Sequence, residues 1–141
     1  MPVRADMVNG HGICHGGFMF TLADSAFAYS CNSYNRNTVA SACAIDFLAP
    51  AREGDVLEAE AIERSRSGRT GVYDITVRVQ ERDDLRVTAT VGTELTVRDG
   101  SADEIEDRDV MRVLVRVDPS NQLSRWRQQV GERRVECHAR H

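Results

Sequence analysis

One carboxylate, Asp24, stands in the middle of an apolar stretch that runs from Phe18 to Tyr29. An ionised group in such surroundings carries a large desolvation cost unless something nearby makes use of it. The loop just before this stretch, residues 9–17, holds two histidines and ends on Gly16 and Gly17. Backbone N–H groups at the start of a helix have no intrahelical partner and favour developing negative charge. A carboxylate and a pair of N–H donors are what attack on a carbonyl group requires.

Both features also have a purely structural interpretation. The two glycines are typical of a tight turn that happens to begin a helix. Asp24 has two hydroxyl-bearing neighbours, Thr21 and Ser25, with which it could form a local hydrogen bond.

The spacing between the glycines and the aspartate restricts how they could act together. Gly16 and Asp24 are eight residues apart, which is about 12 Å along one helix. One reacting carbonyl cannot touch both groups within a single chain. If both act, two chains must lie antiparallel about a two-fold axis, so that Gly16 of one faces Asp24 of the other.

The elements that position these residues follow from the hydrophobic periodicity. The pattern predicts a helix from near Gly16 to residues 32–35, apolar nearly all round and therefore buried. After it the period changes to two, which predicts strands at residues 39–48, 56–66, 71–80 and 85–97, joined by short polar turns. We therefore expect an α+β fold in which a strongly curved antiparallel sheet wraps one long helix.

Composition suits a single globular domain with an ordinary charge balance. The 141 residues are 41% hydrophobic and 28% charged, with a formal net charge of -4. An acidic chain argues against a nucleic-acid partner. The sequence has neither an apolar run of membrane-spanning length nor a signal-peptide pattern, which predicts a cytoplasmic protein with no membrane partner. The four cysteines show no CxxC pair, and we expect Cys31 and Cys43 to be small buried side chains.

The last forty residues differ from the rest in composition. Residues 99–109 are an acidic linker, and residues 118–141 are rich in arginine with Trp126 as the only large apolar anchor. We expect a domain at residues 1–99 followed by an irregular, poorly ordered tail at 100–141. Within that tail, residues 111–117 alternate weakly and are a candidate strand.

Four segments together resemble the hotdog-fold acyl-CoA thioesterases, most closely the phenylacetic-acid-degradation (PaaI) type: residues 7–18, 22–29, 45–50 and 71–74. The similarity covers about residues 3–97. It implies a long central helix wrapped by an antiparallel sheet, and hydrolysis of aryl- or hydroxyaryl-acetyl-CoA by a dimer of dimers with no metal or cofactor. The family has a helix and a first strand before the glycine loop, and this sequence has no residues for them. The strand at 111–117 is a candidate to pair on the sheet edge that this leaves open.

The resemblance assigns roles within the loop and the helix. Asp24 matches the family's nucleophile or general base, and Asn9 matches an asparagine that holds the attacking water or the partners of the aspartate. His15 is similar to a residue that orients the loop. The loop also holds His11 and Cys14, but the set lacks a fourth ligand, so we expect no metal.

Substrate-binding residues are less sharply indicated. One of Ser41 and Cys43 would match a family position that completes the site with a hydroxyl group. Coenzyme A is anionic, so arginines must receive its phosphates, and the candidates surround a turn at residues 65–68: Arg64, Arg66 and Arg69. An aryl pocket could be lined by Phe18, Phe27 and Tyr73, each of which is equally typical of a core.

The sequence thus predicts hydrolysis of an acyl-CoA thioester, with phenylacetyl-CoA or a related aryl-acyl-CoA as substrate. Two alternatives remain open at this point. A hydratase or dehydratase of the same fold would pair an acidic residue with a histidine, and Asp24 and His15 are of the required types. A non-catalytic acyl-CoA-binding domain would need no catalytic carboxylate.

Overall fold

The computed structural model describes residues 1–80, 84–95, 111–116, 125–130 and 133–138. It contains one long helix, α1 (Gly16–Asn32), preceded by a single 3-10 turn at Ala5–Met7. The strands are β1 (Thr38–Phe47), β2 (Leu57–Ser67), β3 (Thr70–Val79), β4 (Asp84–Leu95), β5 (Met111–Arg116), β6 (Arg125–Val130) and β7 (Arg133–His138). Strands β1 to β4 each begin within one residue of the start predicted from periodicity, and residues 96–97 of the last predicted strand lie outside the described residues.

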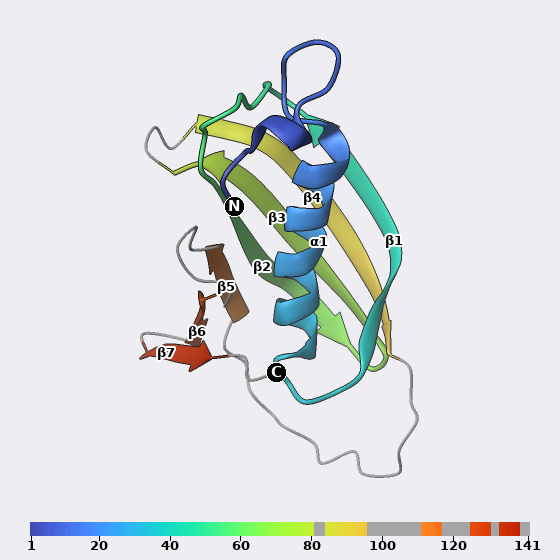
Figure 1. The fold of residues 1–141 in the computed structure, drawn as a ribbon. Coiled ribbons are helices and arrows are strands. Elements are labelled where there is room, and N and C mark those ends of the chain that lie inside the picture. The colour runs from blue at the N-terminus through green and yellow to red at the C-terminus, as the bar shows by residue number, and fades with distance from the viewer. Residues whose placement is uncertain (81–83, 96–110, 117–124, 131–132, 139–141) are drawn as a thin grey trace.

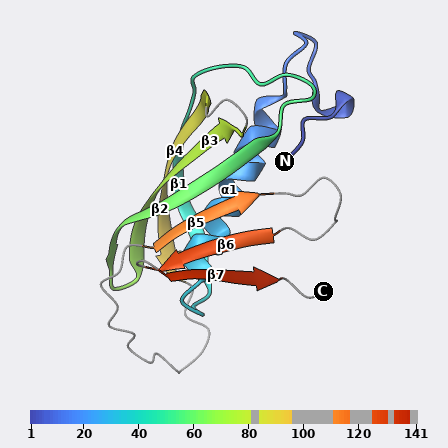
Figure 2. The ribbon, with the colours of Figure 1, turned by 90° about the vertical axis from the view of Figure 1, so that its left-hand side faces the viewer.

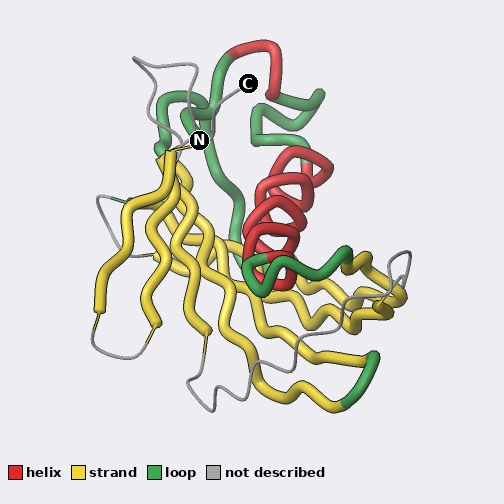
Figure 3. The backbone as a smooth tube through the Cα atoms, turned by 90° about the horizontal axis from the view of Figure 1, so that it is seen from below, coloured by secondary structure: helices red, strands yellow, loops and turns green. Residues whose placement is uncertain are grey.

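All seven strands belong to one antiparallel sheet in the order β1-β4-β3-β2-β5-β6-β7. Strand β1 is one edge of this sheet, while β5, β6 and β7 extend it beyond β2 (Figure 2). Helix α1 runs across the sheet formed by β1 to β4 (Figure 1). Seen from below, the helix lies in the curve of the sheet (Figure 3). The predicted α+β fold with a wrapped central helix is confirmed.

The core lies between α1 and the concave face of the sheet. Residues opposite one another on paired strands point to the same face. The buried side chains of the sheet follow this rule: Ala89 of β4 lies between Ile75 of β3 and Ile45 of β1, and all three face the helix. The helix contributes one buried face: Met19, Leu22, Ala23, Ala26, Phe27, Ser30 and Cys31. Its other face is exposed, so the prediction of a helix buried nearly all round is wrong. The reason is that, in the part of the chain that the structure describes, the sheet covers one side of the helix.

The end of α1 is tied to the start of β1. The Asn32 side chain donates to the Thr38 carbonyl at 3.0 Å and accepts from the Thr38 N–H at 2.9 Å. The Asn32 side chain thus satisfies both backbone groups of Thr38, as a neighbouring strand would, and fixes the start of β1 beside the helix. The position of β1 relative to α1 is therefore set by the sequence around the turn as well as by the core.

The C-terminal third differs from the irregular tail that we expected. Strand β5, at the candidate residues 111–116, pairs with the edge of β2 as considered above, for example Ala61 with Val113. Two further strands, β6 and β7, continue the sheet, so these stretches are regular rather than irregular. The physical reason is that the outer edge of β2 has backbone N–H and C=O groups without strand partners, and β5 supplies those partners. The acidic residues 99–109 lie outside the described residues.

Residues 1–15 approach the helix through short contacts. Pro2 bridges to Val56 and Val8 bridges to Cys14, and the Cys14 N–H donates to the Ala51 carbonyl. These contacts hold the glycine loop against the end of the sheet where β2 begins. Among the described residues, no helix is long and apolar enough to cross a membrane.

Candidate active site

The glycine loop is shaped by Asn9. Its side-chain oxygen accepts from the His11 N–H at 2.9 Å, and its backbone pairs with Ile13 and Gly12. Gly12 has a φ of 72°, in the left-handed region that favours glycine. Asn9 thus holds the loop in place, and its predicted contact with a water molecule stays a prediction. No three His, Cys, Asp or Glu side chains among the described residues converge to hold a metal ion.

His15 caps the N-terminus of α1. Its Nδ1 accepts the Gly17 N–H at 3.0 Å. The expectation that both glycines present free N–H groups is therefore wrong for Gly17, because the capping side chain occupies that donor. The Gly16 N–H has no acceptor among the described residues. The helix start thus offers one outward N–H, at Gly16, in a position where the helix dipole favours negative charge.

The same cap decides between the two roles considered for His15. A ring nitrogen that accepts a hydrogen bond carries no proton, so the proton of the neutral ring sits on Nε2. His15 is engaged in orienting the helix start, as the family resemblance implied. This arrangement gives no support to an acid–base pair between His15 and Asp24 in one chain.

Aromatic rings flank Gly16. A Cβ atom at this position would lie 3.0 Å from the ring of Phe47, so only glycine allows the ring to approach this closely. Phe18 lies edge-on to His15, with ring centroids 6.4 Å apart. Phe18 and Phe47 are 39% and 53% exposed, respectively, which leaves both rings available to a ligand. Sequence analysis missed Phe47; its place at the end of a strand within the Ile45–Pro50 motif was the available signal.

Asp24 lies on the exposed face of α1, together with Gly17, Thr21 and Ala28. The two hydroxyl groups considered as its partners bond elsewhere: Thr21 donates to the Gly17 carbonyl and Ser25 to the Thr21 carbonyl, each at 2.8 Å. Neither hydroxyl group therefore forms the local hydrogen bond that was considered for Asp24, and its catalytic role stays a prediction. Asp24 is exposed rather than desolvated, because no strand among the described residues covers this side of the helix.

Strand β1 brings Cys43 near Asp24. Cys43 lies opposite the buried Val91, so it is on the concave face. Burial and the Asp24 charge both raise the pKa of the Cys43 thiol. The thiol is nevertheless exposed, which corrects the expectation of a buried side chain, whereas Cys31 is buried as expected. Ser41 sits at a bulge in β1 and lies against Gly92 of β4.

Two of the candidate aryl-pocket residues are core residues instead. Phe27 and Tyr73 are each 2% exposed and pack edge to face, with ring centroids 5.5 Å apart. The Tyr73 hydroxyl donates to Glu63 at 2.8 Å, and burial raises the pKa of this phenol. Of the three rings predicted from sequence, only Phe18 is next to the Gly16 N–H.

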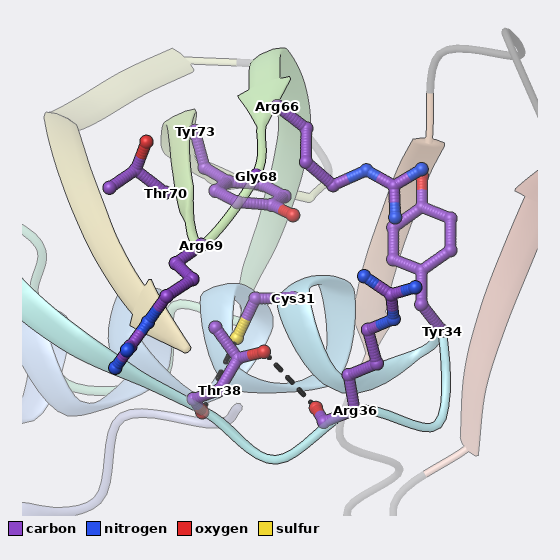
Figure 4. Close-up of a pocket in the computed structure, with 9 residues that line it drawn as sticks. All are labelled: Cys31, Tyr34, Arg36, Thr38, Arg66, Gly68, Arg69, Thr70 and Tyr73. Carbon is purple, nitrogen blue, oxygen red and sulfur yellow. Dashed lines mark hydrogen bonds between the residues drawn. The ribbon is translucent and has the colours of Figure 1, made fainter. Parts of the chain in front are cut away.

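The three candidate arginines separate into two groups. Arg64 pairs with Asp74 at 2.6 Å on the convex face, where Thr90 also bonds to Asp74. Arg66 and Arg69 instead line a small open pocket at the C-terminal end of α1. The pocket also contains Arg36, which sequence analysis missed because it follows the helix in an ordinary polar turn. Figure 4 shows Arg36 and Arg66 on the Tyr34 side of this pocket and Arg69 on the other side.

Comparison with known proteins identifies the fold. Residues 11–86, more than half of the chain, match the model of the thioesterase superfamily. The chain belongs to this family. The matched residues include the capped helix start, Asp24 and strands β1 to β3, so the candidate site lies within the family's core.

Solved structures agree with this assignment and with the hotdog fold. The structure of the Escherichia coli PaaI protein from the phenylacetic acid degradation operon matches with a TM-score of 0.67 and 46% identity, over 69% of this chain and 70% of that one. A Streptococcus mutans protein bound to acetyl-CoA matches with a TM-score of 0.65 and 27% identity, over 68% of this chain and 77% of that one.

The curated relatives are longer than the matched region. The acyl-coenzyme A thioesterase PaaI of Escherichia coli (strain K12) is 55% identical over 82 residues, which are 58% of this chain and 59% of that protein. The chain thus spans less than two thirds of the length of this relative.

Proposed function

We propose that this protein hydrolyses acyl-CoA thioesters, with phenylacetyl-CoA or a related aryl-acetyl-CoA as substrate. The observation that carries the proposal is that one helix has both an outward N–H at Gly16 and an exposed carboxylate, Asp24. The 55% identical relative is named an acyl-coenzyme A thioesterase, and a similar protein has been solved with acetyl-CoA bound. The E. coli relative comes from a phenylacetic acid degradation operon, which favours the aryl substrate.

In this proposal the Gly16 N–H polarises the thioester carbonyl. It donates to the carbonyl oxygen and stabilises the negative charge that develops there during attack. Asp24 supplies the second function, either by attacking the carbonyl carbon itself or by removing a proton from the attacking water. The exposed rings of Phe18 and Phe47 lie beside Gly16, where they can contact an aryl group of the substrate.

Because Gly16 and Asp24 are about 12 Å apart along α1, we propose that the site is shared between two chains. Strand β1 supports this arrangement. It is a sheet edge, eight of its ten residues are exposed, and its only charged residue is Asp46. An edge strand that has a single charged residue and no proline is a ready surface for pairing with another strand. Antiparallel pairing of two β1 strands would cover the open face of both helices.

Thiol release from phenylacetyl-CoA tests the proposal directly. We expect the change Asp24→Asn to lower kcat by about 100-fold to 10,000-fold, with an unchanged thermal midpoint. Asp6→Asn is the matched control, because Asp6 is an exposed aspartate that pairs with the exposed Arg4. Equal release by the wild type and Asp24→Asn would contradict the proposal. It would favour a non-catalytic acyl-CoA-binding domain.

The further oligomeric state, a dimer of dimers, and the cytoplasmic location stay predictions. Sedimentation equilibrium measures the first, and fractionation of the source cells measures the second.

A further inference from the structure

The ring of His15 is held close to the backbone at the start of α1. It folds back over Gly17, where a Cβ atom would lie 3.0 Å from Nδ1 and 3.4 Å from Cε1 of the imidazole. The Phe18 ring meets the same imidazole edge-on. A side chain at position 17 would crowd the ring, so glycine is what allows this close approach. The loop and the first helical turn together fix the position of one histidine ring.

The hydrogen bond that this ring makes requires a neutral imidazole. Nδ1 accepts the Gly17 N–H at 3.0 Å, and a nitrogen that accepts carries no proton. In the charged ring both nitrogens are donors, so turning the ring over supplies no acceptor either. The added positive charge would also face the positive end of the helix dipole. A protonated His15 therefore cannot cap the helix.

The surroundings of His15 supply no partner for a charged ring in the described part of the chain. None of the charged or titratable side chains on the surrounding elements forms an ion pair or a hydrogen bond with His15. They are Arg4 and Asp6 of the 3-10 turn, His11 and Cys14 of the loop, Asp24 of α1, Asp46 of β1, and Arg52, Glu53 and Asp55 of the turn after Ala51. Histidine ordinarily changes charge between about pH 5 and 8, and His15 is exposed to the solvent. The state of the cap should therefore follow the pH of the solution.

We propose that His15 is a positioning residue that works as a pH-sensitive cap: the neutral ring holds the helix start with the Gly16 N–H directed outward, and protonation of the ring releases it. The catalytic consequence rests on the proposed function, in which the Gly16 N–H polarises the thioester carbonyl. The neutral ring occupies the Gly17 N–H and leaves Gly16 as the donor to the carbonyl oxygen. In acid the first turn loses its cap, and the Gly16 N–H is no longer held toward the substrate. Activity should therefore fall in acid with the titration of an imidazole.

The dependence of kcat on pH tests the catalytic consequence. Asparagine caps a helix through a side-chain oxygen that does not titrate. We expect His15→Asn, with each profile normalised to its own maximum, to move the acid limb about one pH unit or more below that of the wild type, because ordinary imidazole and carboxyl groups titrate about two units apart. His11→Asn is the matched control, since His11 is an exposed histidine of the same loop that is bonded through its backbone N–H, and it should keep the wild-type profile. Coinciding acid limbs of the wild type and His15→Asn overturn the catalytic consequence.

Urea denaturation tests the cap without any substrate. Between pH 8 and pH 5 we expect the unfolding equilibrium constant of the wild type to rise about fivefold more than that of His15→Asn, because only the wild type loses its cap. The unfolded chain binds the proton that the capped ring cannot, so this stabilisation is present above the imidazole range and is lost as the pH falls through it. Equal changes in both proteins overturn the pH-sensitive cap. If the wild type hydrolyses no thioester, the proposed function fails, while denaturation still decides whether the cap responds to pH.

Nuclear magnetic resonance of protein labelled with nitrogen-15 in its histidines reads the state of the ring directly. At pH 8 we expect His15 to carry its proton on Nε2 and to have a bare Nδ1, because Nδ1 accepts the Gly17 N–H. On acidification the Gly17 N–H signal should shift together with the protonation of the His15 ring. A proton on Nδ1 at pH 8, or a Gly17 signal that does not follow the ring, overturns the proposal.

Discussion

The two faces of helix α1 have opposite character. One face packs small and large apolar side chains against the concave sheet, and its residues are almost inaccessible to solvent. The other face carries Gly17, Thr21, Asp24 and Ala28, all exposed. The first face explains why the chain folds, and the second carries the proposed chemistry. A helix that is apolar nearly all round in sequence therefore contributes one face to the core and leaves the other face exposed.

The largest loss of stability should come from a substitution on the buried face of α1. We expect Phe27→Ala to lower the free energy of unfolding by about 3–5 kcal/mol, because it leaves a cavity between α1 and Tyr73. Urea denaturation followed by circular dichroism measures the loss. Phe20→Ala is the matched change on the exposed side, where Phe20 is 37% exposed, and it should cost less than half as much. Equal costs would mean that the two faces do not differ as described.

A charge on the β1 edge should prevent the proposed association of two chains. Ala44 is exposed on β1, opposite Thr90 of β4. We expect Ala44→Lys to prevent strand pairing, to convert dimers to single chains in sedimentation, and to lower thioesterase activity about tenfold or more. Thr88→Lys places the same charge on β4, which is paired on both sides. If Ala44→Lys stays a fully active dimer, β1 is not the interface.

The His15 cap of helix α1 should contribute a smaller amount to the free energy of unfolding. We expect His15→Ala to lower the free energy of unfolding by about 1 kcal/mol, since the Gly17 N–H loses its acceptor. His11→Ala, an exposed side chain in the same loop, should leave stability unchanged. Both are measured by urea denaturation, and equal values for the two variants would show that the His15 cap is not stabilising.

The smallest predicted difference is in the rate of alkylation of two thiols, Cys43 and Cys31. Burial raises the pKa of Cys31 to about 11, above the usual value of about 8.5. At pH 8 we expect iodoacetamide to label the exposed Cys43 well before Cys31, as read by peptide mass spectrometry. The neutral Cys31 thiol favours the folded state at pH values below about 8.5, and this contribution is lost as the pH rises through 11. Faster labelling of Cys31 at pH 8 would contradict its burial.

Much of the fold followed from local patterns. The change of period after residue 35 predicted one helix and four strands, and strands β1 to β4 start within one residue of the expected positions. The tail was harder to predict, because the pairing of β5 depends on the open edge of β2, some fifty residues away in sequence. Weak alternation in residues 111–117 indicated a strand, and only the sheet supplied its partner.

The candidate site was predicted in part. Asp24, Gly16 and His15 follow from their types and spacing and lie within the residues that match the family model, and their roles stay predictions. The acceptor for the Gly17 N–H, the ring of Phe47 beside Gly16 and the contribution of Arg36 to a basic pocket were not predictable from spacing. Each depends on a side chain brought from another turn or strand, which sequence distance does not encode.

The sequence by itself determined the helix, its capping loop, the alternation of the strands and the position of the one carboxylate on the helix. These are local properties, since helical and strand periodicities repeat over a few residues. The tertiary structure decided which side of α1 the sheet covers, and hence that Asp24 is exposed. It also divided the arginines between an ion pair with Asp74 on the convex face and a pocket at the end of α1. The reason is that burial and charge pairing depend on contacts between distant residues.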